Sequence, residues 1–443
     1  MKQKLLLLLT AALVWFTIGC NKSSPPTEPP PDKHPNVEII VDDLSSTEAW
    51  FNISLSDTLI NNRVILKLDN ITFKEFNLAL QDTNLFLDSL DYNKAYTLKG
   101  FLFDDDKLIN STETLFRTLD ITSSNFSWQI FKAGTVPSNP SGWRDVTIVN
   151  ENDIWVVGEV YLLDSLGNND PQAYGAAHWD GIEWSIFGVP YRRSPFLTEF
   201  RPGKLRSVIN FGSNAVYATS GYNLLKWNGS KWEEKVVTLD VTIYKIWGSD
   251  ENNIYGAGYN GNVYRYTGNT WEKLPNLTDI HLMDVYGTPD GSKVWICGYS
   301  VDMTKSILLE YEGNNGRILW ERIGKPPIIQ PQYASTVWSG KNNMYFAGGR
   351  EIYQKYFYSD SIYVIHLINN WPYRIRGQGY NDIFVTGDLG MIWHFNGIAW
   401  FLINETSSDD ILNSIAANNN TLVAVGTTYE QFPPRALIYL GKR

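Results

Sequence analysis

A short apolar segment that ends in Gly, or once in Ser, recurs seven times between residues 154 and 426. Most neighbouring copies are about 40 residues apart, and turn residues separate them from further runs of strand character. Units of this length bury their apolar faces only against their neighbours. The C-terminal two thirds of the chain must therefore form one repeat architecture. The copies are Ile154–Gly158, Val216–Ser220, Ile254–Gly258, Val294–Gly298, Met344–Gly348, Ile383–Gly387 and Leu422–Gly426.

Each repeat contains two hairpin signatures. Residues 244–258 align without a gap with residues 373–387, and both segments read as apolar strand, polar turn and second apolar strand, here called A and B. A second motif places a Gly-containing turn before a closing Trp and predicts strands C and D. Four-stranded units in seven copies predict an all-β, seven-bladed β-propeller over residues 122–443. The second motif occurs at His178–Trp184, Lys226–Trp232, Arg265–Trp271 and His394–Trp400.

The last repeat lacks a D strand of its own. Its strand C is expected at Ala436–Leu440, and the sequence given stops at Arg443. The sequence of Asn125–Phe131 matches that of Gly181–Phe187, which contains strand D of the first repeat, although Asn125–Phe131 precedes the first strand A. The segment around Trp128 is therefore expected to complete the seventh blade, which would remove the free edges of the ring.

The repeat resembles bacterial propeller repeats of the type Val-Trp-x-Val-Gly followed by Trp-Asn-Gly-x-x-Trp, which occur in many secreted and surface proteins. The resemblance implies a fold and no single activity. The Trp-Asp-Gly turns are also distantly similar to the Asp-box of sialidases. His178 stands two residues before Asp180, where that motif has Ser.

The N-terminus reads as an export signal. A basic Met1–Lys4 segment precedes the apolar run Leu5–Ile18, and Gly19 and Cys20 follow. Thr17–Cys20 resembles a bacterial lipobox, which implies that residues 1–19 are removed and that Cys20 is acylated. Residues 20–35, rich in Pro, would then tether the protein to a lipid bilayer of the bacterial cell envelope, with the outer membrane expected. The alternative to a lipobox is an ordinary cleaved secretion signal in which Cys20 occurs by chance. Both a periplasmic and a surface orientation of the protein fit the sequence.

Residues 36–121 show about seven short strand-like runs separated by Asp, Asn and Ser turns. The segment resembles a fibronectin type III domain, with an early Trp50 and the pair Leu90 and Tyr96 at the spacing of a tyrosine corner. The resemblance implies a β-sandwich with these three residues in its core. The run Asp104–Asp106 is interpreted as a solvated hairpin tip, with a calcium site as the alternative.

Composition excludes several function classes. The net charge of −10 argues against nucleic acid as a partner. The only cysteines are Cys20 and Cys297, so acylation of Cys20 would leave no intramolecular disulfide, and Cys297 is expected to be a buried core residue. No metal-ligand spacing, phosphate-binding Gly loop or nucleophile elbow occurs, so the sequence predicts no cofactor or metal and assigns no catalytic residue. His178 and His394 share one repeat position, which favours a structural role.

The connections between blades point to one candidate binding face. Long insertions fall in the B–C and blade-to-blade connections, such as residues 159–175 and 188–204. One of them places cations beside aromatic rings, a combination that can stack on sugars or hold a carboxylate. The alternative is a packed loop whose arginines pair with nearby acids. The candidate ligand-binding residues are Tyr191, Arg192, Arg193, Phe196, Phe200, Arg201, Tyr429 and Phe432.

A second aromatic cluster lies in the irregular fifth repeat. It is interpreted as strand packing between blades. Its members are Tyr353, Tyr356, Phe357, Tyr358 and Tyr363.

Three functions fit the sequence. The first is a lipid-anchored envelope protein whose propeller binds glycan or protein without catalysis. The second is a carbohydrate-active hydrolase or lyase, which requires two carboxyl groups near each other at the propeller centre. The third is a structural scaffold of an envelope complex.

Overall fold

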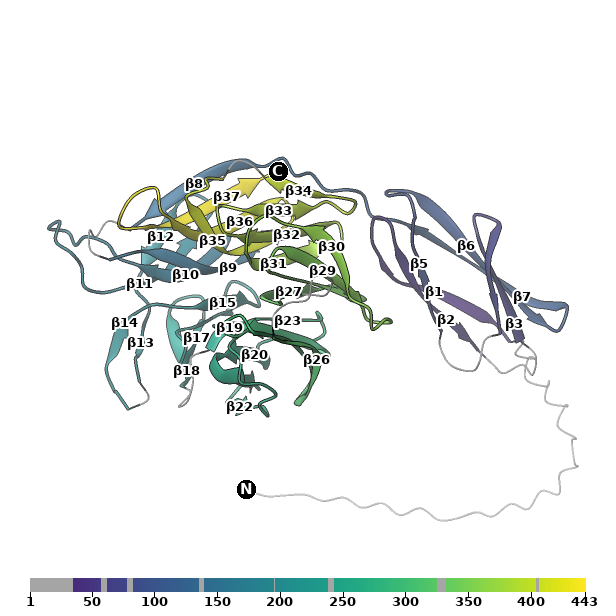
Figure 1. Ribbon diagram of the computed structural model, residues 1–443, viewed down its shortest axis with the longest axis horizontal. Coiled ribbons are helices and arrows are strands. Elements are labelled where there is room, and N and C mark those ends of the chain that lie inside the picture. The colour runs from purple at the N-terminus through teal and green to yellow at the C-terminus, as the bar shows by residue number, and fades with distance from the viewer. Residues whose placement is uncertain are drawn as a thin grey trace, which may run out of the picture.

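The computed structural model describes residues 35–56, 62–77, 83–134, 139–194, 196–237, 243–324, 332–403 and 406–443. These ranges contain β-strands and one 3-10 turn, η1 (Tyr259–Gly261). The strands build a small two-sheet sandwich and a larger ring of sheets (Figure 1). No helix in the described ranges has the length and apolar character needed to cross a membrane. The predicted all-β class is confirmed. Cys20 and the tether residues up to 34 lie outside the described part.

The N-terminal sandwich packs a three-stranded sheet, in the order β1-β2-β5, against a four-stranded sheet, in the order β4-β3-β6-β7. Alternating burial along β6 reflects one face turned to the core and one to solvent. The resemblance to a fibronectin type III domain stays a prediction, while the two-sheet architecture is observed. The strands are β1 (Val37–Leu44), β2 (Ala49–Leu55), β3 (Asn62–Leu68), β4 (Ile71–Phe76), β5 (Thr83–Leu87), β6 (Ala95–Asp104) and β7 (Lys107–Arg117).

Two of the three predicted core residues lie in this sandwich core. Leu90 and Tyr96 are buried there, and the Tyr96 hydroxyl accepts a hydrogen bond from the Asp91 amide at 2.7 Å. Trp50 is buried elsewhere, so its assignment to the sandwich core is wrong. It belongs to a cluster shared with the propeller. Asp105 has a φ of 50° in the turn between β6 and β7, as a hairpin tip requires.

Seven four-stranded antiparallel sheets form the propeller. Blade one holds β9 (Gly142–Asn150), β10 (Asp153–Val160), β11 (Tyr174–Trp179) and β12 (Trp184–Phe187). Blades two and three hold β15 (Ser207–Asn210), β16 (Val216–Thr219), β17 (Asn223–Trp227), β18 (Trp232–Val237), β19 (Ile243–Asp250), β20 (Asn253–Gly258), β21 (Val263–Tyr266) and β22 (Trp271–Lys273).

The remaining blades repeat the pattern. Blades four and five hold β23 (Leu282–Gly287), β24 (Val294–Tyr299), β25 (Lys305–Glu312), β26 (Asn315–Ile323), β27 (Thr336–Ser339), β28 (Asn343–Gly348), β29 (Glu351–Tyr356) and β30 (Tyr363–Leu367). Blades six and seven hold β31 (Pro372–Gly379), β32 (Asp382–Gly387), β33 (Ile392–Phe395), β34 (Trp400–Ile403), β35 (Asp410–Asn418), β36 (Thr421–Thr428) and β37 (Arg435–Lys442).

The repeated apolar segment is strand B of every blade. These strands are buried along nearly their whole length, because the neighbouring blades cover both of their faces. Gly397, in the turn between strands C and D of blade six, has a φ of 103°. A Cβ atom there would lie 2.9 Å from the Cβ of Asn381 in the A–B turn. The Gly of this motif therefore lets the two turns of a blade touch.

Strand β8 (Ser127–Ala133) completes the seventh blade, as predicted. It pairs antiparallel with β37, with Trp128 opposite Gly441. One apolar cluster contains residues of both blade seven and blade one, among them Val423 and Trp143. Each A strand contacts the A strand of the next blade, and β35 contacts β9, so the seven blades form a ring.

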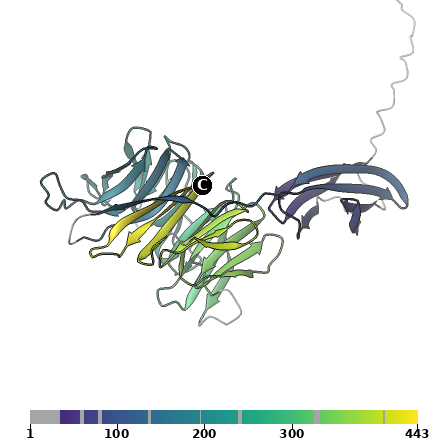
Figure 2. The ribbon, with the colours of Figure 1, turned by 90° about the horizontal axis from the view of Figure 1, so that it is seen from above.

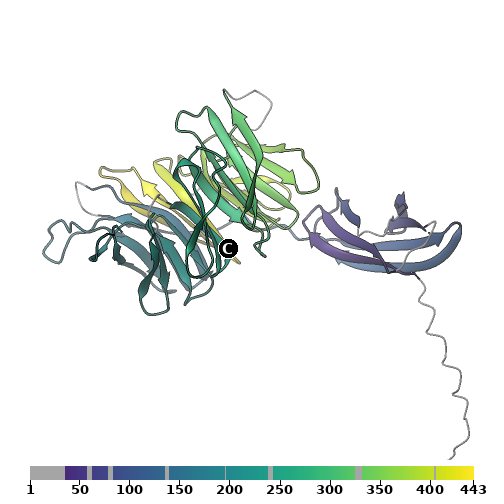
Figure 3. The same ribbon diagram turned by 90° about the horizontal axis from the view of Figure 1, so that it is seen from below.

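The sandwich docks on the A–B and C–D turns of blades five and six. Trp50 packs between Phe86 and Tyr380, with ring centroids 5.5 and 5.4 Å away. Lys341 forms an ion pair with Asp42 at 2.6 Å. Figures 2 and 3 show the sandwich at one edge of the propeller, away from its centre.

Part of the fifth-repeat aromatic cluster also serves this interface. Tyr356 bonds to Glu48, and Phe86 lies 5.2 Å from the ring of Tyr358. Tyr353 stacks on Phe346 within the propeller, as the packing interpretation expects.

Candidate functional site

Two faces of the propeller differ in their connections. The turn face carries the A–B and C–D turns, for example residues 380–381 and 396–399, and part of it is covered by the sandwich. The loop face carries the B–C and blade-to-blade connections, for example residues 161–173 and 368–371. Because the sandwich does not cover the loop face, cavities on that face are the candidate binding sites.

The predicted hairpin site belongs to the loop face. Residues Pro190–Arg192 (β13) and Phe200–Pro202 (β14) form a two-stranded sheet outside the blades. Tyr191 is buried, its hydroxyl donates to the Lys204 carbonyl at 2.7 Å, and burial raises its pKa to about 12. Tyr191 thus anchors the hairpin to the ring.

The hairpin cations are bonded within the protein. Arg192 donates through Nε to Glu234 Oε1 at 2.7 Å, and Arg193 donates to the Pro202 carbonyl at 3.0 Å. Arg201 pairs with Glu199 at 2.7 Å. These contacts agree with the alternative interpretation, a packed loop whose arginines bond within the protein. Phe196 and Phe200 remain exposed on the hairpin.

The two other predicted residues lie on a different connection, between β36 and β37. Phe432 is 91% exposed and lines none of the cavities described here. Tyr429 lines a cavity of about 1000 Å³ between blades five, six and seven. Of the eight predicted ligand-binding residues, only Tyr429 belongs to this cavity, which we call the blade pocket. Its wall includes Gln332, Tyr333, Arg350, Glu351, Asn369, Asn370, Trp371, Asp388, Leu389, Asp409 and Tyr429.

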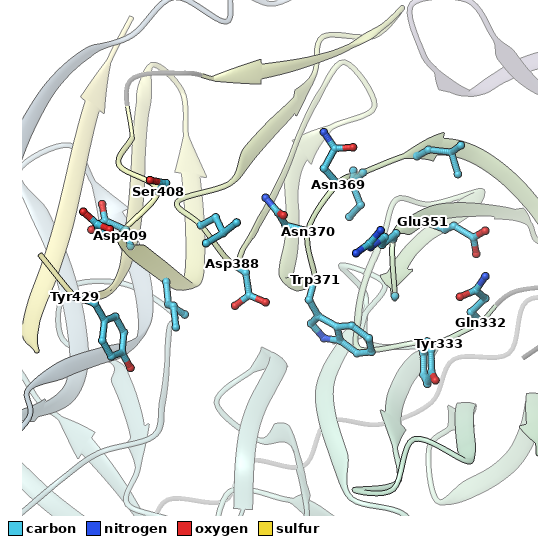
Figure 4. A pocket seen from close by; sticks show the side chains of 17 residues that line it. Gln332, Tyr333, Glu351, Asn369, Asn370, Trp371, Asp388, Ser408, Asp409 and Tyr429 are labelled. Carbon is cyan, nitrogen blue, oxygen red and sulfur yellow. The ribbon is translucent and has the colours of Figure 1, made fainter. Parts of the chain in front are cut away.

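Aromatic rings line two sides of the blade pocket. The Trp371 ring centroid lies 5.1 Å from that of Tyr333 and 5.4 Å from that of Tyr299. These contacts fix the indole at the start of blade six. Figure 4 shows Tyr429 on one side and Trp371 and Tyr333 on the other, with Asp388 between them.

Polar side chains stand around these rings. The amides of Asn369 and Asn370 and the carboxylates of Asp388 and Asp409 all line the pocket. Arg350 and Asp409 form no ion pair with any residue that the structure describes. The pocket therefore offers amide, carboxylate and guanidinium groups to a ligand.

Insertion length did not reveal the blade pocket. The B–C connections of blades five and six, Gly349–Arg350 and Asp388–Met391, are short. The repeat itself offered one usable signal. Directly before strand A of blade six stands Trp371, where the other blades have smaller residues.

The propeller axis holds a polar ring. Each A strand contributes one buried polar residue at this position, and these residues differ in chemistry from blade to blade. They are Asp145, Ser207, Lys245, Asp284, Thr336, Arg374 and Ser414, and all seven are buried.

These axial side chains join neighbouring blades. Asp145 accepts hydrogen bonds from the Val208 amide at 2.9 Å and from the Ser414 hydroxyl at 2.7 Å. Asp284 accepts from the Val337 amide at 3.1 Å. Each carboxylate thus satisfies polar groups of neighbouring blades, which is a structural role.

The axial carboxyl groups of Asp145 and Asp284 are not suited to act as the general acid of a hydrolase. Lys245 lies 2.5 Å from Asp145, and Arg376 bonds to Asp284 at 2.7 Å. Although burial opposes ionisation, these cations lower the pKa of both carboxyls. A glycosidase needs one carboxyl that stays protonated, so this pair lacks the required state.

Both predicted structural histidines are held inside their blades. His394 is fully buried, bonds to Asp382 at 2.8 Å and stacks on Phe384. His178 bonds to Asp153 at 2.9 Å and stacks on Trp155. Cys297 is buried, and burial raises the pKa of its thiol. The described residues contain no group of three or more metal-ligating side chains.

Comparison with known proteins supports the fold alone. No family model matches the chain, and no curated protein matches it. A solved structure described as YCF48 bound to D1 peptide is 12% identical, with a TM-score of 0.50 over 73% of this chain and 97% of that chain. The Pan2 WD40 domain of Neurospora crassa is 10% identical, with a TM-score of 0.46 over 72% of this chain and 97% of that chain.

Proposed function

We propose that this protein is a lipid-anchored component of the bacterial cell envelope whose propeller binds a ligand without catalysis. The observation that carries the binding proposal is the blade pocket, where Trp371 and Tyr429 stand beside polar groups. Two of these, Arg350 and Asp409, form no ion pair with a described residue. Sites with an apolar lining and a few convergent polar groups are typical of ligand binding.

A glycan is the ligand that the pocket fits best. The faces of aromatic rings stack on the apolar faces of sugar rings, and Trp371 supplies such a surface. Asn369, Asn370 and Asp388 can exchange hydrogen bonds with sugar hydroxyls, since amides both donate and accept and carboxylates accept. A volume of about 1000 Å³ accommodates several sugar rings.

A segment of a partner protein is the second candidate, and it would also suit a scaffold of an envelope complex. Its support is the presence of both Arg350 and Asp409 in the pocket wall, since these side chains can pair with charged side chains of a peptide. The structural neighbour described as bound to a peptide adds to this candidate.

The position of the sandwich suits presentation of the loop face. The sandwich lies against the turn face of blades five and six, where Asn381 donates to the Asp120 carbonyl at 2.7 Å. The blade pocket opens on the other face of the same blades. A chain tethered through its N-terminus would therefore leave the pocket uncovered by its own sandwich.

An array of envelope glycans and peptides tests the binding proposal. The full chain with Cys20→Ser, which cannot be acylated on sulfur, would be compared with Trp371→Ala and Tyr429→Ala added to it. We expect Trp371→Ala to weaken binding at least about fivefold, because a stacked aromatic contact contributes about 1 kcal/mol and the lost buried area adds to this.

Phe196→Ala is the matched control, because Phe196 is an exposed ring on the same face outside the pocket. This variant should bind as the unsubstituted chain does. Equal binding by all variants would refute the blade pocket as the site.

Fractionation tests the anchoring proposal separately. The wild-type chain should sediment with envelope membranes and partition into detergent. Cys20→Ser should release it into the soluble fraction, and a membrane-bound Cys20→Ser chain would contradict the lipid anchor.

A further inference from the structure

The propeller axis carries an excess of positive charge. Five cationic side chains lie along it, Arg144, Arg206, Lys245, Arg374 and Arg376, against the two carboxylates Asp145 and Asp284. The whole chain has a net charge of −10. This local excess is therefore opposite in sign to the protein that surrounds it.

Three of these cations line a cavity of about 230 Å³ at the loop-face end of the axis, which we call the axial mouth. None of the described residues that line it carries a carboxylate. Its wall consists of Arg144, Arg206, Tyr244, Met283, Tyr299, Ser335, Tyr373, Arg374 and Asn413.

Two of the three mouth arginines have no counterion among the described residues. Arg144 and Arg206 form no ion pair with a described residue, and Arg206 lies over the ring of Tyr244 at 5.2 Å. Arg374 is only 9% exposed and shares Asp284 with Arg376. The buried Nε of Arg374 and that of Arg206 have no hydrogen-bond partner in the described structure.

The acids nearest in the network are already engaged. Asp284 bonds to Arg376 and to Thr336, and Asp145 bonds to Lys245, Ser207 and Ser414. Asp388, in the wall of the blade pocket, lies near Tyr373, and burial together with this carboxylate raises the pKa of Tyr373. Burial, reinforced by the positive charges of Arg374 and Arg376 and opposed by Asp145, lowers the pKa of Lys245 to about 8.

We propose that the axial mouth is a binding site for a small oxyanion group, a carboxylate or a phosphate, held by Arg144, Arg206 and Arg374. A guanidinium donates two parallel hydrogen bonds to either group, and three of them converge on one small cavity. Tyr244 and Tyr373 line the same cavity.

The axial mouth adjoins the blade pocket. Tyr299 lines the mouth, and its ring centroid lies 5.4 Å from that of Trp371 in the pocket. Tyr373 of the mouth lies near enough to Asp388 of the pocket for that carboxylate to contribute, after burial, to its raised pKa. A ligand in the blade pocket that carries an acidic group can therefore place that group at the arginines. The anion site itself does not depend on the proposed function of the pocket.

Calorimetric titration with inorganic phosphate and, separately, with acetate tests the site in the full chain. Total ionic strength is held constant with NaCl, because exposed charges respond to salt. We expect saturable one-to-one binding of at least one anion to the wild type. Preference for phosphate or for acetate identifies which oxyanion the mouth suits.

The decisive variant is Arg144→Gln with Arg206→Gln, which leaves the buried Arg374 in place. It should weaken anion binding at least about tenfold, since two charge-assisted contacts are lost. Arg193→Gln with Arg201→Gln removes two exposed hairpin arginines and is the matched control. It should bind like the wild type.

Thermal unfolding of each variant checks that the fold is intact. Absence of saturable binding by either anion, or equal binding by the Arg144 and Arg206 variant and the wild type, would overturn the proposal. No ligand of the blade pocket is present in these titrations. Failure of the anion site is therefore distinguishable from failure of the proposed pocket.

Discussion

Asp284 should be among the most important single side chains for the stability of the propeller. It is fully buried at the axis and joins blades four, five and six. Its carboxylate accepts hydrogen bonds from Arg376 at 2.7 and 2.9 Å, from the Thr336 hydroxyl at 2.6 Å and from the Val337 amide at 3.1 Å, and it pairs with Arg374. Asp284→Asn keeps the shape of the side chain and removes its charge.

The loss can be worked out from these contacts. The substitution leaves two buried guanidinium groups without their counterion and turns an amide toward them. Breaking a buried ion pair by neutralising one partner costs about 3–5 kcal/mol. We expect the free energy of unfolding, measured by urea denaturation at pH 7, to fall by about this amount.

The pH dependence gives a second signature. The pKa of Asp284 lies well below its ordinary value, because Arg374 and Arg376 outweigh the effect of burial. Its stabilising contribution is therefore complete above the pKa of the unfolded chain, about 4, and is lost as the pH falls toward the folded pKa. The stability difference between wild type and Asp284→Asn should stay constant from pH 7 to 5 and shrink below pH 4.

Asp279→Asn is the matched control. Asp279 pairs with Lys305 at 3.2 Å, but its side chain is 80% exposed, so the change should cost less than about 1 kcal/mol. If Asp284→Asn proved no more destabilising than Asp279→Asn, the axial network would not have the stabilising role assigned to it.

Three further predictions concern the interface, the closing strand and the thiol. Trp50→Ala should weaken docking of the sandwich by about 3 kcal/mol, so that two separate unfolding transitions appear in calorimetry, whereas the exposed Ile71→Ala should not separate them. Deletion of residues 429–443 removes β37, the partner of both β8 and β36, and should abolish cooperative unfolding of the propeller; an unchanged transition would contradict closure by β8. Cys297 should react with iodoacetamide only after denaturation, because it is fully buried and its thiol pKa is raised, and rapid labelling of the native protein in mass spectrometry would refute this.

The blades were predictable because each has one repeated strand whose burial leaves a mark in the sequence. Strand B is covered on both faces, so a run such as Val294–Gly298 contains only apolar and small residues. The D strand around Trp128 was predictable for a related reason, since its amino-acid sequence matches that of strand D in blade one. The axial ring left no such mark, because Asp145, Ser207 and Lys245 occupy one structural position with three different chemistries.

The sites were harder to predict because they depend on contacts between distant segments. Insertion length pointed to the hairpin of Arg192, whose charge is paired with Glu234 from blade two. The blade pocket instead forms where short connections of three blades diverge, around Trp371. Trp50 was assigned to the wrong core for the same reason, since its partner Tyr380 is more than three hundred residues away in the chain.

Hydrogen–deuterium exchange with a ligand identified on the array tests the central claim most directly. Binding at the blade pocket predicts slower exchange in residues 349–351, 367–371, 388–389 and 408–411, which line it. Exchange at the hairpin, residues 190–202, should not change. Protection confined to that hairpin, or to the turn face, would contradict the account.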